Sequence, residues 1–370
     1  MDADLNSVYL QVMQANQPED LFGCEDVVLP EATLLKYLKG EYGKFKRLTK
    51  PSLYHDPLDV EAATDADARL EELYSLAQTR IRQHVYGIEG RGKRHPTYAV
   101  KSFTVGANRY FIGNLLRGGE DSNLYEGFME RDGLAVGEVV IKVAKDQSFN
   151  PLLQTEVRNL DFLHETPVPQ WKHLPFVMDR FQSGGRVGLV FRKIGGFSLT
   201  EVRAHRTHAK GVDRKHIVWM LDRGFSCLGY VHRLGLVHGN LSPEHFIVQP
   251  PSHNAIICGW KQAVHKPAVT GEKVIAIPGE FTAPEVAERG KIGPWSDIYS
   301  LGKLMIWTLG GDTATNTIPD SVEEPLRRFL LSLVEENHLV RPADAWSLYE
   351  QQCKIKDSLW PRKFLHFDMA

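Results

Sequence analysis

The chain has few cysteines, no long apolar run and almost no net charge. Its 370 residues include only four cysteines, and none of them forms a Cys-x-x-Cys pair. This spacing argues against a zinc knuckle or a redox dithiol and favours a reducing compartment. No stretch approaches the roughly 18 apolar residues of a membrane span, and the acidic first residues do not resemble a secretory signal. We therefore expect a cytoplasmic protein that has no membrane partner.

The charge balance excludes a further class. Lys and Arg total 44 while Asp and Glu total 46, so the formal net charge is −2. A dedicated nucleic-acid binder needs a positive field that this balance does not supply, and we expect no nucleic-acid partner. Hydrophobic residues make up 42% of the chain and charged residues 24%, which is typical of a folded protein with a sizeable core.

Hydrophobic periodicity divides the chain into parts. Residues 30–50 and 65–81 place apolar side chains at three- and four-residue steps, which predicts two amphipathic helices joined by a loop. Short β-type runs follow, and helical periodicity then returns at His216–Leu234, Asp297–Leu309, Val322–Glu336 and Ala343–Lys354. The predicted class is α+β. The predicted parts are a helical domain (1–85), a linker rich in glycine and basic residues (86–100), a β-rich lobe (101–193) and a helical lobe (194–370).

Several motifs in the second part of the chain follow one another in a recognisable order. They are Tyr110–Tyr125 with two central glycines, Val139-Val-Ile-Lys142, Leu236–Val248 (LVHGNLSPEHFIV), Phe281-Thr-Ala-Pro-Glu285, Trp295–Gly302 (WSDIYSLG) and Arg341-Pro-Ala343. Together they resemble the ordered landmarks of the protein kinase superfamily. The resemblance implies a bilobal kinase-like fold, with a small β-rich lobe followed by a larger helical lobe.

The resemblance also implies which residues would hold a nucleotide. Lys142 stands where kinases carry the lysine that neutralises the α- and β-phosphates, and Glu156 is the candidate for its carboxylate partner. In the glycine-rich segment the three family positions fall on Arg117, Gly119 and Ser122. Only Gly119 would let the backbone approach a phosphate closely, so the segment is poorly suited to this task. A plain hairpin and a solvent-facing lysine are the alternative interpretations.

The residues that perform chemistry in kinases are replaced. Asn240 stands at the position of the catalytic aspartate, and an amide cannot serve as a base. His245 stands at the position of a metal-binding asparagine. The metal-binding aspartate aligns with Cys258 by its spacing from His245, or with Gly259 by the aromatic residue that follows. Neither residue supplies the oxygen ligand that Mg²⁺ prefers, so we expect no metal site.

The structural landmarks are present. In kinases the aspartate at the position of Asp297 binds the backbone of the catalytic loop, and the histidine at the position of His238 lies in this loop. The glutamate and the arginine at the positions of Glu285 and Arg341 form a pair. The combination of intact structural residues and replaced catalytic residues resembles a pseudokinase, which is a kinase fold used for binding rather than for phosphoryl transfer. We therefore predict a catalytically impaired adaptor or scaffold for other proteins. The alternatives are an atypical Ser/Thr kinase and a protein that binds ATP without a metal through Lys142.

The first part of the chain resembles a degenerate J domain, the helical hairpin with which co-chaperones stimulate a heat-shock ATPase through a His-Pro-Asp loop. Glu31–Tyr42 and Asp65–Tyr74 would form its helices, and the loop reads His55-Asp56-Pro57, with the last two residues exchanged. The exchange changes which residue the proline ring restricts. A J-like adaptor that contacts a heat-shock chaperone and a plain helical hairpin both stay open.

One pair of histidines has the spacing of metal ligands on a helix. His205 and His208 lie three residues apart, but the sequence indicates no third ligand nearby. We therefore expect two surface histidines rather than a metal site.

Overall fold

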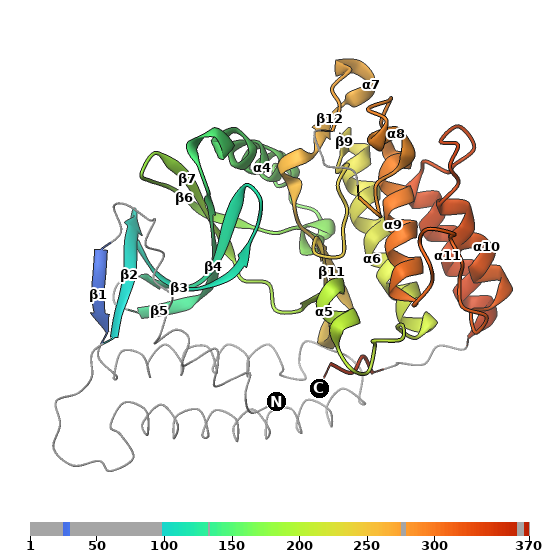
Figure 1. The fold of residues 1–370 in the computed structure, drawn as a ribbon, viewed down its shortest axis with the longest axis horizontal. Helices are drawn as coiled ribbons and strands as arrows, with labels where there is room; N and C mark the ends of the chain where they lie inside the picture. The colour runs from blue at the N-terminus through green and yellow to red at the C-terminus, as the bar shows by residue number, and fades with distance from the viewer. Residues whose placement is uncertain (1–24, 30–97, 132–133, 275–278, 361–365, 370) are drawn as a thin grey trace, which may run out of the picture. The chain divides into compact units, whose positions relative to one another are not determined.

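A computed structural model describes residues 25–29, 98–131, 134–274, 279–360 and 366–369 (Figure 1). The chain divides into two compact units, one of Met1–Asn150 with Val177–Lys193 and one of Pro151–Phe176 with Ile194–Ala370. Residues 151–176, which the sequence assigns to the β-rich lobe, thus group with the second unit. The helices expected near the start of the chain, the linker and the His55-Asp56-Pro57 loop lie outside the described residues.

A seven-stranded antiparallel sheet forms the first unit, in the order β1-β2-β3-β4-β5-β7-β6 (Figure 1). Its strands are β1 (Glu25–Leu29), β2 (Tyr98–Val105), β3 (Asn108–Gly118), β4 (Ser122–Arg131), β5 (Leu134–Ala144), β6 (Val177–Ser183) and β7 (Arg186–Arg192). The sequence did not predict β1, which pairs with β2 from Glu25↔Ser102 to Leu29↔Tyr98. The two strands lie far apart in the sequence, so their pairing has no local pattern, and the sequence signal for β1 itself is a short Val-Val run.

The sheet curls so that strands distant in its order meet around one core. Phe103 of β2 stacks on Phe181 of β6 with ring centroids 4.0 Å apart. The Tyr110 hydroxyl and the Asn108 amide both donate to the Asp179 carboxylate of β6, the amide at 2.7 Å. Burial and the Asp179 carboxylate raise the pKa of Tyr110 far above its usual value. The core is filled by Phe103, Tyr110, Ile112, Tyr125, Met129, Val139, Ile141, Val143 and Val190.

Helices dominate the second unit. They are α4 (Asn150–Leu163), α5 (Leu199–Ala204), α6 (Arg214–Arg233), α7 (Pro267–Thr270), α8 (Pro284–Ala287), α9 (Pro294–Thr308), α10 (Glu324–Leu333) and α11 (Ala345–Leu359). The four long helices predicted from periodicity correspond to α6, α9, α10 and α11. Its short strands are β8 (Phe197–Ser198), β9 (Leu236–Val237), β10 (Phe246–Gln249), β11 (Asn254–Ile257) and β12 (Val264–His265). The described residues therefore confirm the α+β class.

Local signals set the helix starts. Asp213 caps α6 by accepting from the Lys215 N–H at 2.8 Å, and Asp344 caps α11 in the same way. Helix α9 begins with Pro294, whose fixed φ suits the first helical position. Nearly every side chain of α9 is buried, and a Cβ at Gly302 would lie 2.8 Å from Leu333 of α10. This helix is the central element of the second unit.

A buried histidine makes the second unit sensitive to acid. His173, at the end of the short 3₁₀ segment Pro169–His173, is fully buried, and its Nδ1–H donates to the Ala255 carbonyl at 2.9 Å. Burial lowers the pKa of His173 to about 4. The ordinary pKa of histidine is about 6.5, so between these values the unfolded chain binds a proton that the folded chain does not.

Stability should therefore fall as the pH falls from about 6.5 to about 4, with His173 contributing roughly 1.4 kcal/mol per pH unit. Urea unfolding at several pH values tests this for the wild type and for His173→Gln, whose amide can still donate to Ala255. We expect the variant to lose less stability over this pH range. Equal slopes for the two proteins would contradict the assignment.

Candidate functional site

One carboxylate holds the loop that follows β9. Asp297, in the first turn of α9, accepts hydrogen bonds from the His238 and Gly239 backbone N–H groups, both at 2.8 Å. His232, in the last turn of α6, donates its Nε2–H to the same carboxylate at 2.8 Å. Burial alone raises the pKa of Asp297, but these donors lower it below its usual value. Asp297 is therefore an anchoring anion for the loop backbone.

The side chain of His238 joins this loop to the β11 end. Its Nδ1 accepts from the Asn240 N–H at 3.3 Å, so the ring proton lies on Nε2, which donates to the Cys258 carbonyl at 2.8 Å. The ring packs edge-on against Trp260, with centroids 4.6 Å apart. Burial lowers the pKa of His238, in agreement with a neutral imidazole.

His245, Cys258 and Gly259 lie side by side. The Cys258 N–H donates to the His245 carbonyl at 2.8 Å and continues the β10–β11 register. The His245 Nδ1–H donates to the Asn240 carbonyl at 2.8 Å. Gly259 has a φ of 85°, and a Cβ there would lie 2.6 Å from the His245 ring. A larger residue at position 259 would strain the backbone and displace the His245 ring, whereas Cys258 does not have a positive φ.

Two residues that the sequence did not single out complete this arrangement. One is His232, and the other is Asn159 of α4, whose side-chain amide donates to the Trp260 and Ala263 carbonyls at 2.9 and 3.1 Å. Helix α4 is thereby fixed to the segment that follows β11. Neither residue has a sequence signal of its own, because each partner lies at least 65 residues away along the chain.

The proposed lysine–glutamate pair involves both units. Lys142 lies in β5, opposite Leu124 and Leu189, and its side chain is buried. Glu156 lies on the buried face of α4, one turn before Asn159. Lys142 belongs to the first unit and Glu156 to the second, and their pairing stays a prediction.

The glycine-rich segment is a tight hairpin. The Gly119 N–H donates to the Ser122 carbonyl at 2.9 Å, so Glu120 and Asp121 alone form the turn. The Asp121 carboxylate accepts from the Ser122 hydroxyl at 2.8 Å, and its backbone carbonyl accepts from the Lys145 N–H at 2.9 Å. The one glycine amide at a family position is therefore used within the turn. Arg117 pairs with Leu124 on the strands below.

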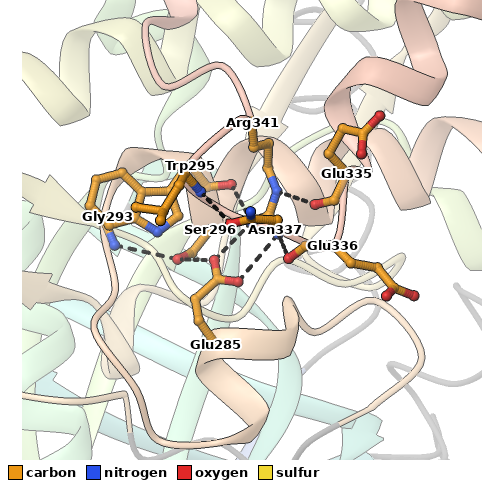
Figure 2. Close-up of polar contacts among 9 residues, drawn as sticks. Glu285, Gly293, Trp295, Ser296, Glu335, Glu336, Asn337 and Arg341 are labelled. Carbon is orange, nitrogen blue, oxygen red and sulfur yellow. Dashed lines mark hydrogen bonds and ion pairs between the residues drawn. The ribbon is translucent and has the colours of Figure 1, made fainter.

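A buried ion pair fixes the start of α9 (Figure 2). Figure 2 shows the Arg341 guanidinium facing the Glu285 carboxylate and three backbone carbonyls. Both terminal nitrogens of Arg341 donate to Glu285, at 2.8 and 3.3 Å. The other N–H groups donate to the carbonyls of Trp295, Glu335 and Glu336, at 3.1, 2.7 and 3.0 Å. All five donors of Arg341 are therefore satisfied.

The same pair reaches the first turn of α9 through a serine. The Ser296 hydroxyl donates to Glu285 at 2.7 Å and accepts from the Gly293 N–H at 3.3 Å. The Tyr299 ring lies 4.6 Å from the Arg341 guanidinium carbon. Asp297 follows Ser296 directly, so the loop anchor and the ion pair share one helical turn.

The expectation of two surface histidines is wrong for His208. Its side chain is buried, because its ring stacks on Phe367 near the C-terminus, a contact that no local pattern indicates. Within the described ranges, no group of three or more His, Cys, Asp or Glu side chains is arranged to hold a metal ion. No helix in the described part of the chain is long and apolar enough to cross a bilayer.

Comparison with solved structures identifies the fold. The crystal structure of the PF14_0431 kinase domain matches with a TM-score of 0.53 at 12% identity, covering 65% of this chain and 94% of that chain. The chain has a protein kinase-like fold. The β-rich unit and the helical unit agree with the expected lobes of this fold, while the predicted J-like domain falls on residues outside the description. No protein-family model matches the chain.

Sequence comparison points the same way. The serine/threonine-protein kinase PknL of Mycobacterium tuberculosis is 28% identical over 210 residues, 56% of this chain and 50% of PknL. PknA of the same species is 26% identical over 229 residues, 59% of this chain and 52% of PknA. An inactive leucine-rich repeat receptor-like serine/threonine-protein kinase of Arabidopsis thaliana is 29% identical over 113 residues, 29% of this chain and 18% of that protein. The chain spans about half the length of the two bacterial relatives.

Replacement of Arg341 should lower the free energy of unfolding of the second unit. Arg341→Met leaves the Glu285 carboxylate buried without its cation, which typically costs about 3–5 kcal/mol. Arg328→Met is the matched control, because Arg328 is an exposed partner of Glu324 and such pairs contribute less than about 1 kcal/mol. Urea unfolding compares the two variants, and similar losses of stability would contradict a special role for the buried pair.

Proposed function

We propose that the chain is a catalytically impaired kinase-like protein that acts in the cytoplasm as an adaptor or scaffold for other proteins. The proposal rests on the loop between β9 and β10, which keeps the backbone contacts of the family while its side chains differ. Its backbone is anchored by Asp297. Asn240, His245 and either Cys258 or Gly259 stand at the positions where the family resemblance implies carboxylate and amide groups that act on substrate and metal.

The residues present do not fit a magnesium–ATP complex. Mg²⁺ takes oxygen ligands in near-octahedral geometry, and a thiol, an imidazole and a glycine do not supply a carboxylate. Phosphates would also meet a hairpin whose Gly119 amide is bonded within the turn and whose next two residues are acidic. We derive no phosphoryl-transfer step through this site.

Two alternatives keep a nucleotide. PknL and PknA are named serine/threonine kinases, which favours an atypical kinase that orients its acceptor by another group. The buried Lys142 favours a protein that binds ATP without a metal, with Glu156 as the partner of the lysine. Both alternatives need the Lys142 cation, which makes Lys142→Ala the common test variant.

A chaperone link is a further part of the proposal. It rests on the resemblance of the first part of the chain to a J domain and on His55, Asp56 and Pro57 in its loop. The partner in this case is a heat-shock ATPase.

Transfer of labelled phosphate from ATP, measured with Mg²⁺ and with Mn²⁺, tests the central proposal. We expect incorporation into the chain itself and into Ser/Thr peptides to equal that of Lys142→Ala, since Asn240, at the position of the catalytic base, carries an amide. Asn240→Asp and Cys258→Asp together restore two carboxylates and serve as the matched control for assay conditions.

Phosphate transfer by the wild type that disappears in Lys142→Ala would overturn the proposal in favour of the atypical kinase. The melting temperature separates the remaining alternative in the same samples. A ligand at about 100 times its dissociation constant stabilises a protein by about 2.7 kcal/mol. A melting temperature raised by ATP in EDTA, and unchanged in Lys142→Ala, would identify the metal-independent nucleotide binder.

A further inference from the structure

A small pocket lies between the end of α6 and the start of α11, both of which belong to the second unit. Its volume is about 420 Å³, which is large enough for a small organic molecule. Helix α6 contributes Gly229, His232 and Arg233 to its walls, and residues 343–346 form the other side. The Trp346 ring lies against Gly229, where an added Cβ would approach it to 2.7 Å. The missing side chain at position 229 therefore makes room for the indole in the wall.

One polar atom in the wall of this pocket has no partner among the described residues. Only 7% of the His232 side chain is exposed. Its Nε2–H donates to Asp297 at 2.8 Å, whereas its Nδ1 is buried and makes no hydrogen bond with a described residue. The two nitrogens of an imidazole point in diverging directions, so Nδ1 faces away from Asp297, and in the neutral ring it is an acceptor. A buried acceptor without a donor is costly, which marks Nδ1 as the atom to which a ligand donates.

The wall of the pocket also carries a negative charge. The Asp344 carboxylate is exposed and accepts from the Trp346 and Ser347 N–H groups at 3.1 and 3.3 Å. The Ser347 hydroxyl, these N–H groups and the His232 ring lower the pKa of Asp344 below its usual value, so the group is ionised at neutral pH. Each carboxylate oxygen can accept more than one hydrogen bond. An imidazole acceptor, a carboxylate and an indole ring together favour a ligand that donates hydrogen bonds and carries a positive charge.

We propose that this pocket, which we call the α6–α11 pocket, binds a small primary amine. The ammonium group donates to His232 Nδ1 and lies beside the Asp344 carboxylate, while the carbon skeleton packs on the Trp346 ring. The amine thereby contacts the ring whose other nitrogen donates to Asp297, the anchor of the loop after β9. Arg233 is exposed at the rim, where solvent screens its charge. The inference goes beyond the proposed adaptor role and does not depend on it.

Nitrogen NMR of the full-length chain, with isotope-labelled histidine, tests the site. The probe is phenethylamine at about pH 8, where neutral imidazole and protonated amines coexist. We expect a saturable shift of the His232 Nδ1 resonance, because this acceptor nitrogen gains a donor. Phenethyl alcohol keeps the phenyl ring and one donor but has no charge, and the N-acetyl derivative of the probe is no longer an amine. Both compounds should bind at least about 5-fold more weakly than phenethylamine, because they lack the charge.

Matched variants locate the interaction. His232→Gln, whose amide can still donate to Asp297, identifies the His232 resonance by its loss. Asp344→Asn keeps a good helix cap and removes the charge, so it should weaken binding of phenethylamine about 3-fold. Glu350→Gln removes an exposed carboxylate of the same helix that does not line the pocket, and it should leave the affinity unchanged.

A His232 resonance that stays unchanged up to the solubility limit of phenethylamine would overturn the proposal. Equal affinities for phenethylamine and phenethyl alcohol would overturn it too, because a donor alone would then account for binding. The same holds for equal affinities of the wild type and Asp344→Asn. These outcomes are independent of phosphate transfer, so the failure of this pocket and the failure of the proposed adaptor role are distinguishable.

Discussion

The carboxylate of Asp297 is the interaction on which the second unit depends. A buried anion is costly unless donors surround it, and here two backbone N–H groups and the His232 ring do so. The loop after β9 therefore has a fixed backbone, whatever its side chains are. The neighbouring Ser296 connects the same helical turn to the buried pair of Glu285 and Arg341. One turn of α9 thus holds both the loop and α8 in place.

The histidine side chains of this loop pack against neighbouring residues and bind backbone carbonyls. His238 is neutral and joins the loop to the Cys258 carbonyl, and His245 bonds the Asn240 carbonyl. Gly259 gives room to the His245 ring. A loop with a fixed backbone and an amide at the position of the catalytic base can present a surface to another protein, which is the physical basis of the proposed adaptor role.

Patterns within short stretches predicted much of this protein. Periodicity located α6, α9, α10 and α11, and ordered motifs indicated the kinase-like fold. The interactions that join distant segments were not predictable, because single residues such as His232, Asn159 and Phe367 carry no pattern. The burial of His208 follows from its contacts with Phe367 and with Asp368, which lies 160 residues further along the chain. The sequence indicated that the turn at Gly119 is poorly suited to binding phosphate. The hydrogen bond that the Gly119 N–H makes within the turn has no sequence signal.

Amide hydrogen exchange at His238 and Gly239 tests the central claim most directly, because both N–H groups bind the buried Asp297 carboxylate. The claim is that the loop is a fixed scaffold that does not depend on nucleotide. Exchange should therefore be slow in the protein alone, unchanged by ATP with Mg²⁺, and faster in Asp297→Asn. Fast exchange that becomes slow only when ATP and Mg²⁺ are added would contradict the claim.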